Sequence, residues 1–218
     1  MIKDFIKQYN LNLNEQQLSA VTTKERKTLL LSVPGSGKTT VTVARIGYLL
    51  KCMKANAGEI LTLTFSKSAA REMSDRFTKV FDDLESPHFS TIHSFCYMVI
   101  KEHCTQTKRP VPELERYPQG VLRAILQGVD ALVLNNVHGK ISHVKNNDLS
   151  DEEIRDIKVE GINSFYNVYQ LYNNMLQREN KIDFDDMLVR TWELFEHVND
   201  NALLHQFRNR YRYINIDE

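Results

Sequence analysis

The chain has 218 residues, of which 42% are hydrophobic and 26% are charged, and its 28 basic residues balance 28 acidic ones. This length suits one large domain, or a domain with a smaller insert, and the composition excludes collagen-like, disordered and membrane-embedded classes. Because no apolar run approaches the ~20 residues of a membrane helix and the first residues lack a secretory signal, we expect a cytoplasmic protein without membrane contact.

Four short apolar segments, each bounded by polar or turn residues, predict buried strands at residues 28–33, 60–65, 88–92 and 213–216. Helical patterns lie between the first three of these segments. This alternation is typical of an α/β domain with a parallel sheet and crossover helices.

A proline-rich break at residues 108–118 marks the expected edge of a helical insert, since its three prolines would interrupt any regular element. No strand candidate of comparable quality follows until residue 213. The next apolar residues predict one helix face, formed by Val121, Leu122, Ile125, Leu126, Val129 and Leu132.

The second half of the insert is expected to be a polar loop at residues 135–149, followed by a long helix. Ser150 and Glu153 form a capping box at the start of this helix. Its apolar stripe, which is more typical of core packing than of a partner groove, comprises Ile154, Ile157, Gly161, Phe165, Val168, Tyr172 and Met175. The expected domains are an α/β domain at 1–110, the insert at 111–180 and a return to the first domain at 181–218.

Residues 29–40, LLLSVPGSGKTT, have the strand, glycine-bearing loop and helix of a phosphate-binding loop. Gly35 and Gly37 let successive N–H groups point at phosphates, Lys38 would reach the β and γ phosphates, and Thr39 would coordinate magnesium. Ser32 stands where this pattern usually has glycine. The full set of predicted nucleotide contacts from this loop is Ser32, Val33, Pro34, Gly35, Ser36, Gly37, Lys38, Thr39 and Thr40.

Five further segments decide between the many classes of protein that share such a loop. They are LNEQQLSAV at 13–21, ILTLTFSKSAAREM at 60–73, TIHSFC at 91–96, IDFDDML at 182–188 and YRYINIDE at 211–218. In this order and at these spacings they resemble the motifs of superfamily 1 DNA helicases of the UvrD, Rep and PcrA type. The resemblance covers essentially the whole chain and implies a RecA-like P-loop NTPase domain interrupted by an all-helical insert.

This resemblance implies roles for residues of the nucleotide site. Gln17 would read the adenine edge and favour ATP over GTP. Asp217 would hold Mg²⁺ together with Thr39, and Glu218 would orient or deprotonate the attacking water. With Lys38, these two acids complete the predicted catalytic set.

The resemblance also implies contacts to single-stranded DNA from Thr64, Phe65, Lys67, His93 and Ser94. Phe65 would stack on a base, although the alternative is a core phenylalanine at a strand end. Ser66, Lys67 and Ser68 depart from the usual Thr, Asn and Lys, so the individual phosphate contacts stay open. His93 taken alone is more typical of a structural histidine.

The charged residues and the cysteines allow more than one interpretation. Zero net charge does not predict DNA binding, so any DNA phosphates must meet a local cluster, Lys67, Arg71, Arg76 and Lys79, which is also typical of a solvated helix face. The acids of 182–188 could be interpreted as a metal cluster, but we expect a structural use. Cys52, Cys96 and Cys104 lack CxxC spacing, so we expect reduced, mostly buried thiols.

The implied activity is 3′-to-5′ translocation on single-stranded DNA and unwinding of 3′-tailed duplex DNA, coupled to ATP hydrolysis with Mg²⁺. The sequence ends within the DE motif, and in such helicases a second domain supplies arginines that reach the γ phosphate, so we expect an ATP-binding part that turns over ATP poorly alone. We also expect it to be monomeric. The strand after this motif, central in RecA-like sheets, would lie beyond Glu218. Alternatives are a nucleotide-binding interaction module without unwinding activity and a small-molecule kinase, although a kinase does not need the segments around Gln17 and Phe65.

Overall fold

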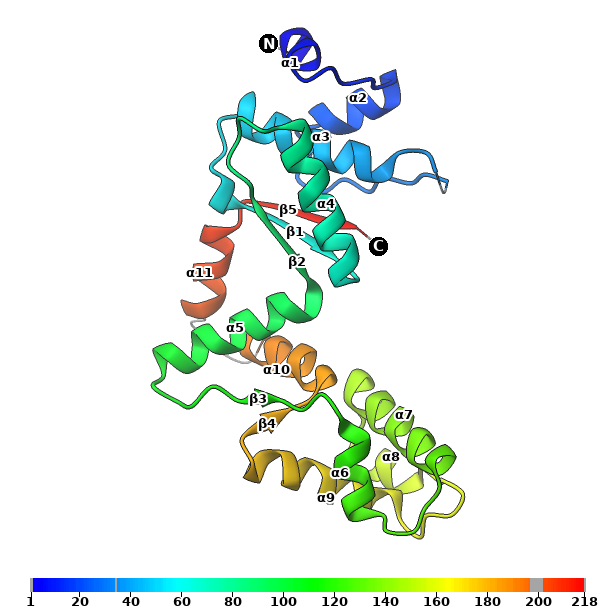
Figure 1. Cartoon of the computed structure of the whole chain (residues 1–218). Helices are drawn as coiled ribbons and strands as arrows, with labels where there is room; N and C mark the ends of the chain where they lie inside the picture. Colours follow the sequence, from blue (N-terminus) through cyan, green and yellow to red (C-terminus); the bar gives the residue numbers. More distant parts are fainter. Residues whose placement is uncertain (1, 34, 197–201, 218) are drawn as a thin grey trace. The chain divides into compact units, whose positions relative to one another are not determined.

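The computed structural model describes residues 2–33, 35–196 and 202–217 (Figure 1). Its contacts divide the chain into two compact units. The first comprises Met1–Phe95 and Leu204–Glu218, and the second comprises Cys96–Leu203. The insert predicted at 111–180 falls wholly within the second unit, while its limits stay a prediction.

The first unit is built on a three-stranded parallel sheet in the order β2-β1-β5. Its strands are β1 (Ile60–Thr64), β2 (His88–Thr91) and β5 (Tyr213–Asp217). All five residues of β1 are buried, as expected for the central strand of a parallel sheet. The strands predicted from the apolar segments at 60–65, 88–92 and 213–216 are thereby confirmed.

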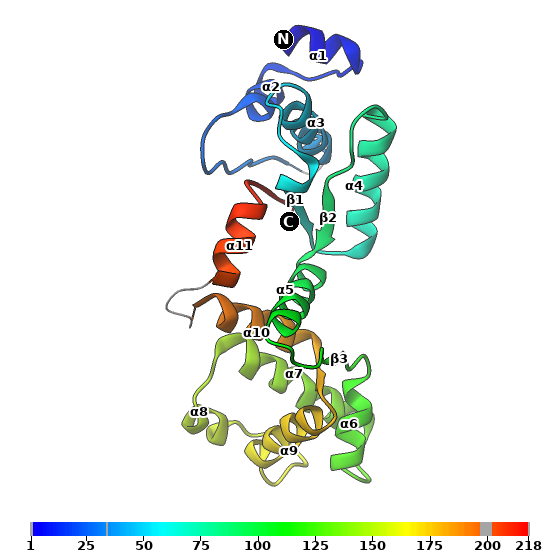
Figure 2. The same cartoon turned by 90° about the vertical axis from the view of Figure 1, so that its left-hand side faces the viewer.

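In the first unit, α4 runs beside β2 in both views (Figures 1 and 2), and buried residues of α3 pack with Ile60 of β1. The helices are α1 (Ile2–Gln8), α2 (Glu15–Thr22), α3 (Lys38–Lys51), the 3-10 turn η1 (Ala57–Glu59) and α4 (Lys67–Val80). Two more, α5 (Ile92–Gln106) and α11 (Ala202–Arg210), contain the points at which the chain passes between the units. The helices predicted between the first three apolar segments are confirmed, since α3 lies between residues 33 and 60 and α4 lies between residues 65 and 88.

The strand predicted at residues 28–33 is wrong. This segment is irregular, and Leu29 and Leu31 are 82% and 81% exposed. An extended apolar segment becomes a strand only when a neighbouring strand pairs with its backbone groups. The described sheet ends at β5, so residues 28–33 have no partner in it.

The second unit is helical, with a core of its own around Leu134, Val137, Tyr172 and Leu176. Its helices are α6 (Pro118–Ile125), α7 (Ala131–Asn147), α8 (Asp151–Asp156), α9 (Phe165–Arg178) and α10 (Phe184–Glu196). Two short strands, β3 (Glu113–Leu114) and β4 (Lys181–Ile182), pair in parallel. The helical character predicted for this part of the chain is confirmed, whereas the β3–β4 pair was not predicted.

Three details of the second unit differ from the sequence-based expectation. The polar loop expected at 135–149 is mostly α7, which Asp130 caps and which buries Ile141 and Val144. The single helix face expected from residues 121 to 132 is divided between α6 and α7. The chain turns between these two helices, and Gly128 in the turn has a φ of 79°. The capping box of Ser150 is present, but it opens the six-residue α8 rather than a long helix.

The long helix is interrupted for a local reason. Gly161 has a φ of 78°, in the left-handed region that a continuous helix does not use. The side chain of Ser164 then accepts a hydrogen bond from the N–H of Asn167 and starts α9 as a separate helix. In the described ranges, which omit 1, 34, 197–201 and 218, no helix has the length and apolar character needed to cross a bilayer.

Candidate nucleotide site

The glycine-bearing loop turns directly into α3. Gly35 and Gly37 have φ angles of 79° and 88°, which glycine adopts without strain. The N–H of Ser36 donates to the carbonyl oxygen of Val33 at 3.2 Å, and the carbonyl oxygen of Gly37 accepts from Val41 at 2.9 Å. Because Gly37 has no side chain to cap the helix, the first-turn N–H groups of α3 are suited to an anion.

An apolar face anchors α3 to the sheet. Val43 and Ile46 are buried in a cluster that also contains Ile60 at the start of β1, with Tyr213 at the start of β5 packed against it. Val43 and Ile46 lie three residues apart on one side of α3, and Ile60 and Tyr213 are the first residues of their strands, so the packing follows from the sequence pattern. This packing fixes the helix that carries Lys38 against the strand that carries the predicted acid.

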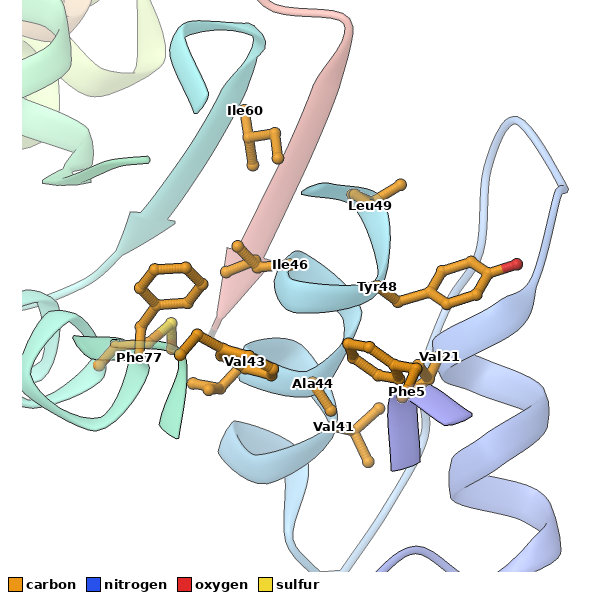
Figure 3. Close-up of a cluster of buried hydrophobic side chains, with 12 residues drawn as sticks. Phe5, Val21, Val41, Val43, Ala44, Ile46, Tyr48, Leu49, Ile60 and Phe77 are labelled. Atoms are coloured by element: carbon orange, nitrogen blue, oxygen red, sulfur yellow. The ribbon is translucent and has the colours of Figure 1, made fainter. Parts of the chain in front are cut away.

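The direction of α3 brings its start to the relevant end of the sheet. Figure 3 shows Ile60 on the side of Ile46 and Leu49, in the second half of the helix, while Val41 lies toward the end at which β5 stops. The beginning of α3 therefore lies at the same end of the sheet as Asp217. This is the arrangement expected of a phosphate loop and an acidic strand end in an α/β domain.

Asp217 is the last residue of β5 and is paired in register with Thr64, which is itself paired with Thr91. Two positions earlier on the same side of β5, Asn215 Nδ2 donates to the hydroxyl of Thr62 at 3.3 Å. Thr62, Thr64 and Thr91 are buried. The carboxyl end of the sheet thus presents a row of small polar side chains leading to Asp217.

The remaining predicted nucleotide contacts vary in exposure. Ser32 and Val33 are exposed in the irregular segment before the loop, Thr39 is half-buried, and Thr40 is exposed. Pro34 and the predicted catalytic Glu218 lie outside the described residues. The roles assigned to this set stay predictions.

Gln17 contacts the phosphate loop directly. Its Nε2 donates to the carbonyl oxygen of Ser36 at 3.0 Å. Its Oε1 accepts from the N–H of Asn14 at 3.0 Å, and the N–H of Gln17 donates to Asn14 Oδ1 at 2.9 Å, which together form a capping box at the start of α2. The same side chain therefore caps α2 and reaches the loop.

The sequence-based interpretation missed two residues that hold α2 against α3. Arg45 donates from Nη1 to the carbonyl oxygen of Val21 at 2.7 Å, and Val21 is fully buried. Burial holds the pKa of Arg45 below its usual range, although the group remains a strong donor. An arginine among apolar residues in the middle of α3 is the sequence signal that points to such a contact.

The predicted DNA-contacting residues gather at the ends of β1 and β2. Phe65, directly after β1, is 78% exposed, which excludes the core alternative for this ring. Lys67 opens α4 and is exposed, His93 is half-buried, and Ser94 is exposed. Their contact with DNA stays a prediction.

Hydroxyl groups shape the turns at these strand ends. Thr64 donates from Oγ1 to the carbonyl oxygen of Ser66 at 3.0 Å, just before α4. Thr91 donates from Oγ1 to Ser94 Oγ at 2.9 Å and accepts from the N–H of Ser94 at 3.1 Å. Thr64 is buried, so its hydroxyl belongs to the turn that presents Phe65.

The basic cluster on α4 is largely balanced by acids on the same helix. Arg76 lies 2.6 Å from Glu72, and Arg71 lies 3.9 Å from Asp75. These pairs and Lys79 line one shallow surface groove. The pairing favours the solvated-face interpretation for Arg71 and Arg76.

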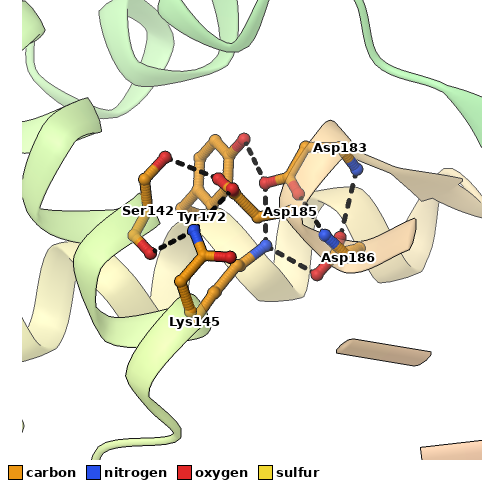
Figure 4. Close-up of polar contacts among 7 residues, drawn as sticks. Ser142, Lys145, Tyr172, Asp183, Asp185 and Asp186 are labelled. Atoms are coloured by element: carbon orange, nitrogen blue, oxygen red, sulfur yellow. Dashed lines mark hydrogen bonds and ion pairs between the residues drawn. The ribbon is translucent and has the colours of Figure 1, made fainter. Parts of the chain in front are cut away.

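The acids of residues 182–188 are engaged in a buried network of the second unit (Figure 4). Lys145 Nζ lies 2.7 Å from both Asp183 Oδ2 and Asp186 Oδ1, and Tyr172 donates to Asp183 at 2.9 Å. Asp185 accepts from Ser142 at 2.5 Å. These contacts support the structural use expected for the segment over the metal-cluster alternative.

Within the described ranges 2–33, 35–196 and 202–217, no three His, Cys, Asp or Glu side chains form a metal-binding group. The three cysteines are free thiols, as predicted, with Cys96 and Cys104 buried and Cys52 half-buried. Burial raises the pKa of the Cys96 thiol, so this group stays protonated and unreactive near neutral pH.

Comparison with known proteins gives consistent matches. Residues 13–218 match the family described as UvrD/REP helicase N-terminal domain. The chain is 31% identical to "ATP-dependent DNA helicase PcrA" of Staphylococcus aureus, with 95% of this chain and 29% of that protein covered. It is 29% identical to "Probable DNA helicase II homolog" of Mycoplasma capricolum, with 94% of this chain and 30% of that protein covered. The chain spans about three tenths of the length of these curated relatives.

Proposed function

Since the chain belongs to the UvrD/REP helicase N-terminal domain family, we propose that it forms the ATP-binding part of a helicase that moves 3′-to-5′ along single-stranded DNA and unwinds 3′-tailed duplexes. The observation that carries this proposal is the glycine-bearing loop that enters α3 at the end of the sheet where β5 terminates in Asp217. We assign the unwinding to the whole protein rather than to these 218 residues, since the relatives named as helicases are about three times as long.

Different residues of the site would bind different parts of the nucleotide. The amides around Gly35 and Gly37, with the start of α3, would receive the phosphates, and the ammonium of Lys38 would neutralise their charge. Gln17 would offer an N–H and a lone pair to the adenine edge. These groups bind and orient ATP.

The oxygen donors of Thr39 and Asp217 fit Mg²⁺, which prefers hydroxyl, carboxylate and phosphate oxygens. A bound Mg²⁺ would neutralise charge on the phosphates. Glu218 would orient the attacking water and accept its proton. In this chain alone the hydrolysis step is expected to be slow, because related motors complete their site with arginines that accelerate it by ~10³ to 10⁵.

Single-stranded DNA would cross the ends of β1 and β2. An exposed aromatic ring such as Phe65 stacks on any base and contributes about 1 to 3 kcal/mol. Lys67, His93 and Ser94 would meet the phosphates beside it. Such contacts do not distinguish base sequences, as a translocating motor requires.

Nucleotide titration tests the first half of the proposal. The 218-residue chain should bind Mg-ATP, and Lys38→Ala should weaken binding tenfold or more, because a hydrogen bond to a charged group contributes about 1.5 to 3 kcal/mol. Lys27→Ala removes an exposed lysine outside the loop and serves as the matched control. Equal affinities in all three proteins, or phosphate release at helicase-like rates by this chain alone, would contradict the proposal.

Binding of a fluorescent oligothymidine tests the second half. Phe65→Ala should weaken binding by roughly fivefold or more, as loss of one stacked base predicts. Tyr117→Ala, which removes a ring that is 75% exposed on α6's N-terminal side, should leave binding unchanged. If both variants bind like the unmodified chain, Phe65 does not lie on the DNA path.

A further inference from the structure

We propose that Gln17 positions the phosphate loop itself, in addition to any contact it makes with the base. The proposal rests on the proposed nucleotide site, because it assumes that the loop receives phosphates. Gln17 Nε2 donates to the carbonyl oxygen of Ser36 at 3.0 Å, and Gln17 Oε1 accepts from the N–H of Asn14 at 3.0 Å. One side chain thereby joins the start of α2 to the loop 19 positions later.

The contact at Ser36 controls the next amide. A trans peptide is planar, so its carbonyl oxygen and its N–H point in opposite directions. Because Gln17 holds the carbonyl oxygen of Ser36, the N–H of Gly37 points away from α2. Glycine-flanked peptides rotate easily, and the Gln17 contact selects one orientation among those that Gly35 and Gly37 permit.

The side of the loop that faces α2 is also filled by Gln17. A Cβ added to Gly37 would lie 3.2 Å from Gln17 Nε2, which is tighter than nine in ten such contacts, so Gln17 would have to shift by a few tenths of an ångström. The φ of 88° at position 37 favours glycine independently. Gln17 and Gly37 are complementary in shape as well as in hydrogen bonding.

Hydrogen bonds hold Gln17 at the start of α2 and hold the end of α2 to α3. The N–H of Gln17 donates to Asn14 Oδ1 at 2.9 Å, so both backbone and side chain of Gln17 are tied to the first turn of α2. The far end of α2 is fixed to α3 through Arg45 and the carbonyl oxygen of Val21, 2.7 Å apart. A displaced loop peptide would have to break the Gln17 contact rather than carry α2 with it.

Positioning the loop does not prevent recognition of adenine. A glutamine amide has two N–H donors and an oxygen with two lone pairs. Ser36 and Asn14 use one of each. The remaining N–H and lone pair are the two groups that an adenine edge takes, so base and loop would engage the same amide simultaneously.

A probe without a base separates the two roles. Inorganic tripolyphosphate with Mg²⁺ should bind Gln17→Met about threefold to tenfold more weakly than the unmodified chain, as the loss of one positioning hydrogen bond predicts. Gln16→Met changes the neighbouring, exposed glutamine of α2 and is the matched control, so its affinity should be unchanged. Thermal unfolding of both variants shows how much stability the loss of the α2 cap costs in Gln17→Met.

A second measurement needs no ligand. In a ¹⁵N–¹H NMR spectrum, the Gly37 amide resonance should shift or broaden in Gln17→Met and stay in place in Gln16→Met. The proposal is overturned if tripolyphosphate affinity and the Gly37 resonance are the same in all three proteins, or if both variants change equally. If Gln17→Met loses only its selectivity for ATP over GTP, Gln17 contacts the base and does not position the loop. If the unmodified chain does not bind Mg-ATP, the proposed function is refuted instead.

Discussion

Lys145 Nζ lies 2.7 Å from Asp183 Oδ2, and both side chains are only 5% exposed. Asp186 offers a second carboxylate to the same ammonium, also at 2.7 Å. The pair joins α7 to the start of α10, 38 residues later in the chain. Removing one member of such a buried pair leaves the other charge uncompensated.

Lys145→Met is therefore expected to lower the free energy of unfolding of the second unit by about 3 to 5 kcal/mol. Urea unfolding followed by circular dichroism measures the change. Lys140→Met, on the exposed side of the same helix, is the control and should stay within about 0.5 kcal/mol of the unmodified chain. A small effect at position 145 would mean that the network adds nothing to the stability of the helical unit.

Acid should destabilise the second unit through Asp183. Burial acts to raise the pKa of this carboxyl, but the Lys145 ammonium and three hydrogen bonds outweigh it, so the pKa lies below its usual range. The resulting stability is fully present above the unfolded value of ~3.9 and is lost as pH falls through the lower folded value. In unfolding measured from pH 5 downward, Asp183→Asn should flatten this acid slope, and an unchanged slope would contradict the assignment.

His88 provides a separate acid-sensitive contact in the first unit. Its Nδ1 lies 3.1 Å from the Tyr211 hydroxyl, and burial, with Arg210 nearby, lowers the pKa of the imidazole. The stability contributed by neutral His88 is present above ~6.5 and is lost as pH falls through the lower folded pKa. His88→Asn should remove the part of the pH dependence of unfolding that begins just below pH 6.5, which thermal scans at half-unit intervals would detect.

Two helical glycines should respond in opposite directions to alanine. A Cβ on Gly47 in α3 would overlap the ring of Phe81, which is fully buried, so Gly47→Ala should destabilise the first unit by about 1 to 3 kcal/mol. A Cβ on Gly139 in α7 would meet open space, so Gly139→Ala should stabilise the second unit by about 0.5 to 1 kcal/mol. The two midpoints of chemical unfolding, compared with that of the unmodified chain, test both signs.

The fold could be predicted where local pattern and tertiary pairing agree. The segments that became β1, β2 and β5 have both the apolar composition of strands and neighbours to pair with. Residues 28–33 have the same composition without a partner, and composition cannot reveal that difference. The strands β3 and β4 have two residues each, which is too short for an alternation of apolar and polar residues to indicate a strand.

The predictions of helix boundaries in the second unit were wrong for a different reason. Asparagines in 135–149 obscured the spacing of Leu134, Val137, Ile141 and Val144, which are all buried on one side of α7. Conversely, a regular apolar spacing from 154 to 175 hid the left-handed turn at Gly161. Apolar periodicity alone therefore neither requires nor excludes a continuous helix.

At the candidate site, the local sequence was sufficient to predict the phosphate loop. It was insufficient to predict the contacts that hold this loop and α3 against α2. The series from Gly35 to Thr39 is contiguous, so its turn into α3 follows from the residues themselves. The contacts of Gln17 with Ser36 and of Arg45 with Val21 join positions 19 and 24 residues apart. A residue such as Arg45 among apolar neighbours signals that it has a polar partner, but the identity of the partner depends on how α2 lies against α3, which no local pattern encodes.

The outer edge of β5 has a consequence for the chain in solution. Ile214 and Ile216 are exposed on this strand, which is the last of the described sheet. An unpaired strand with apolar side chains is a template for edge-to-edge pairing, and zero net charge at pH 7 removes the long-range repulsion that keeps molecules apart. Light scattering should therefore rise with protein concentration most steeply near neutral pH, and Ile216→Lys should suppress it.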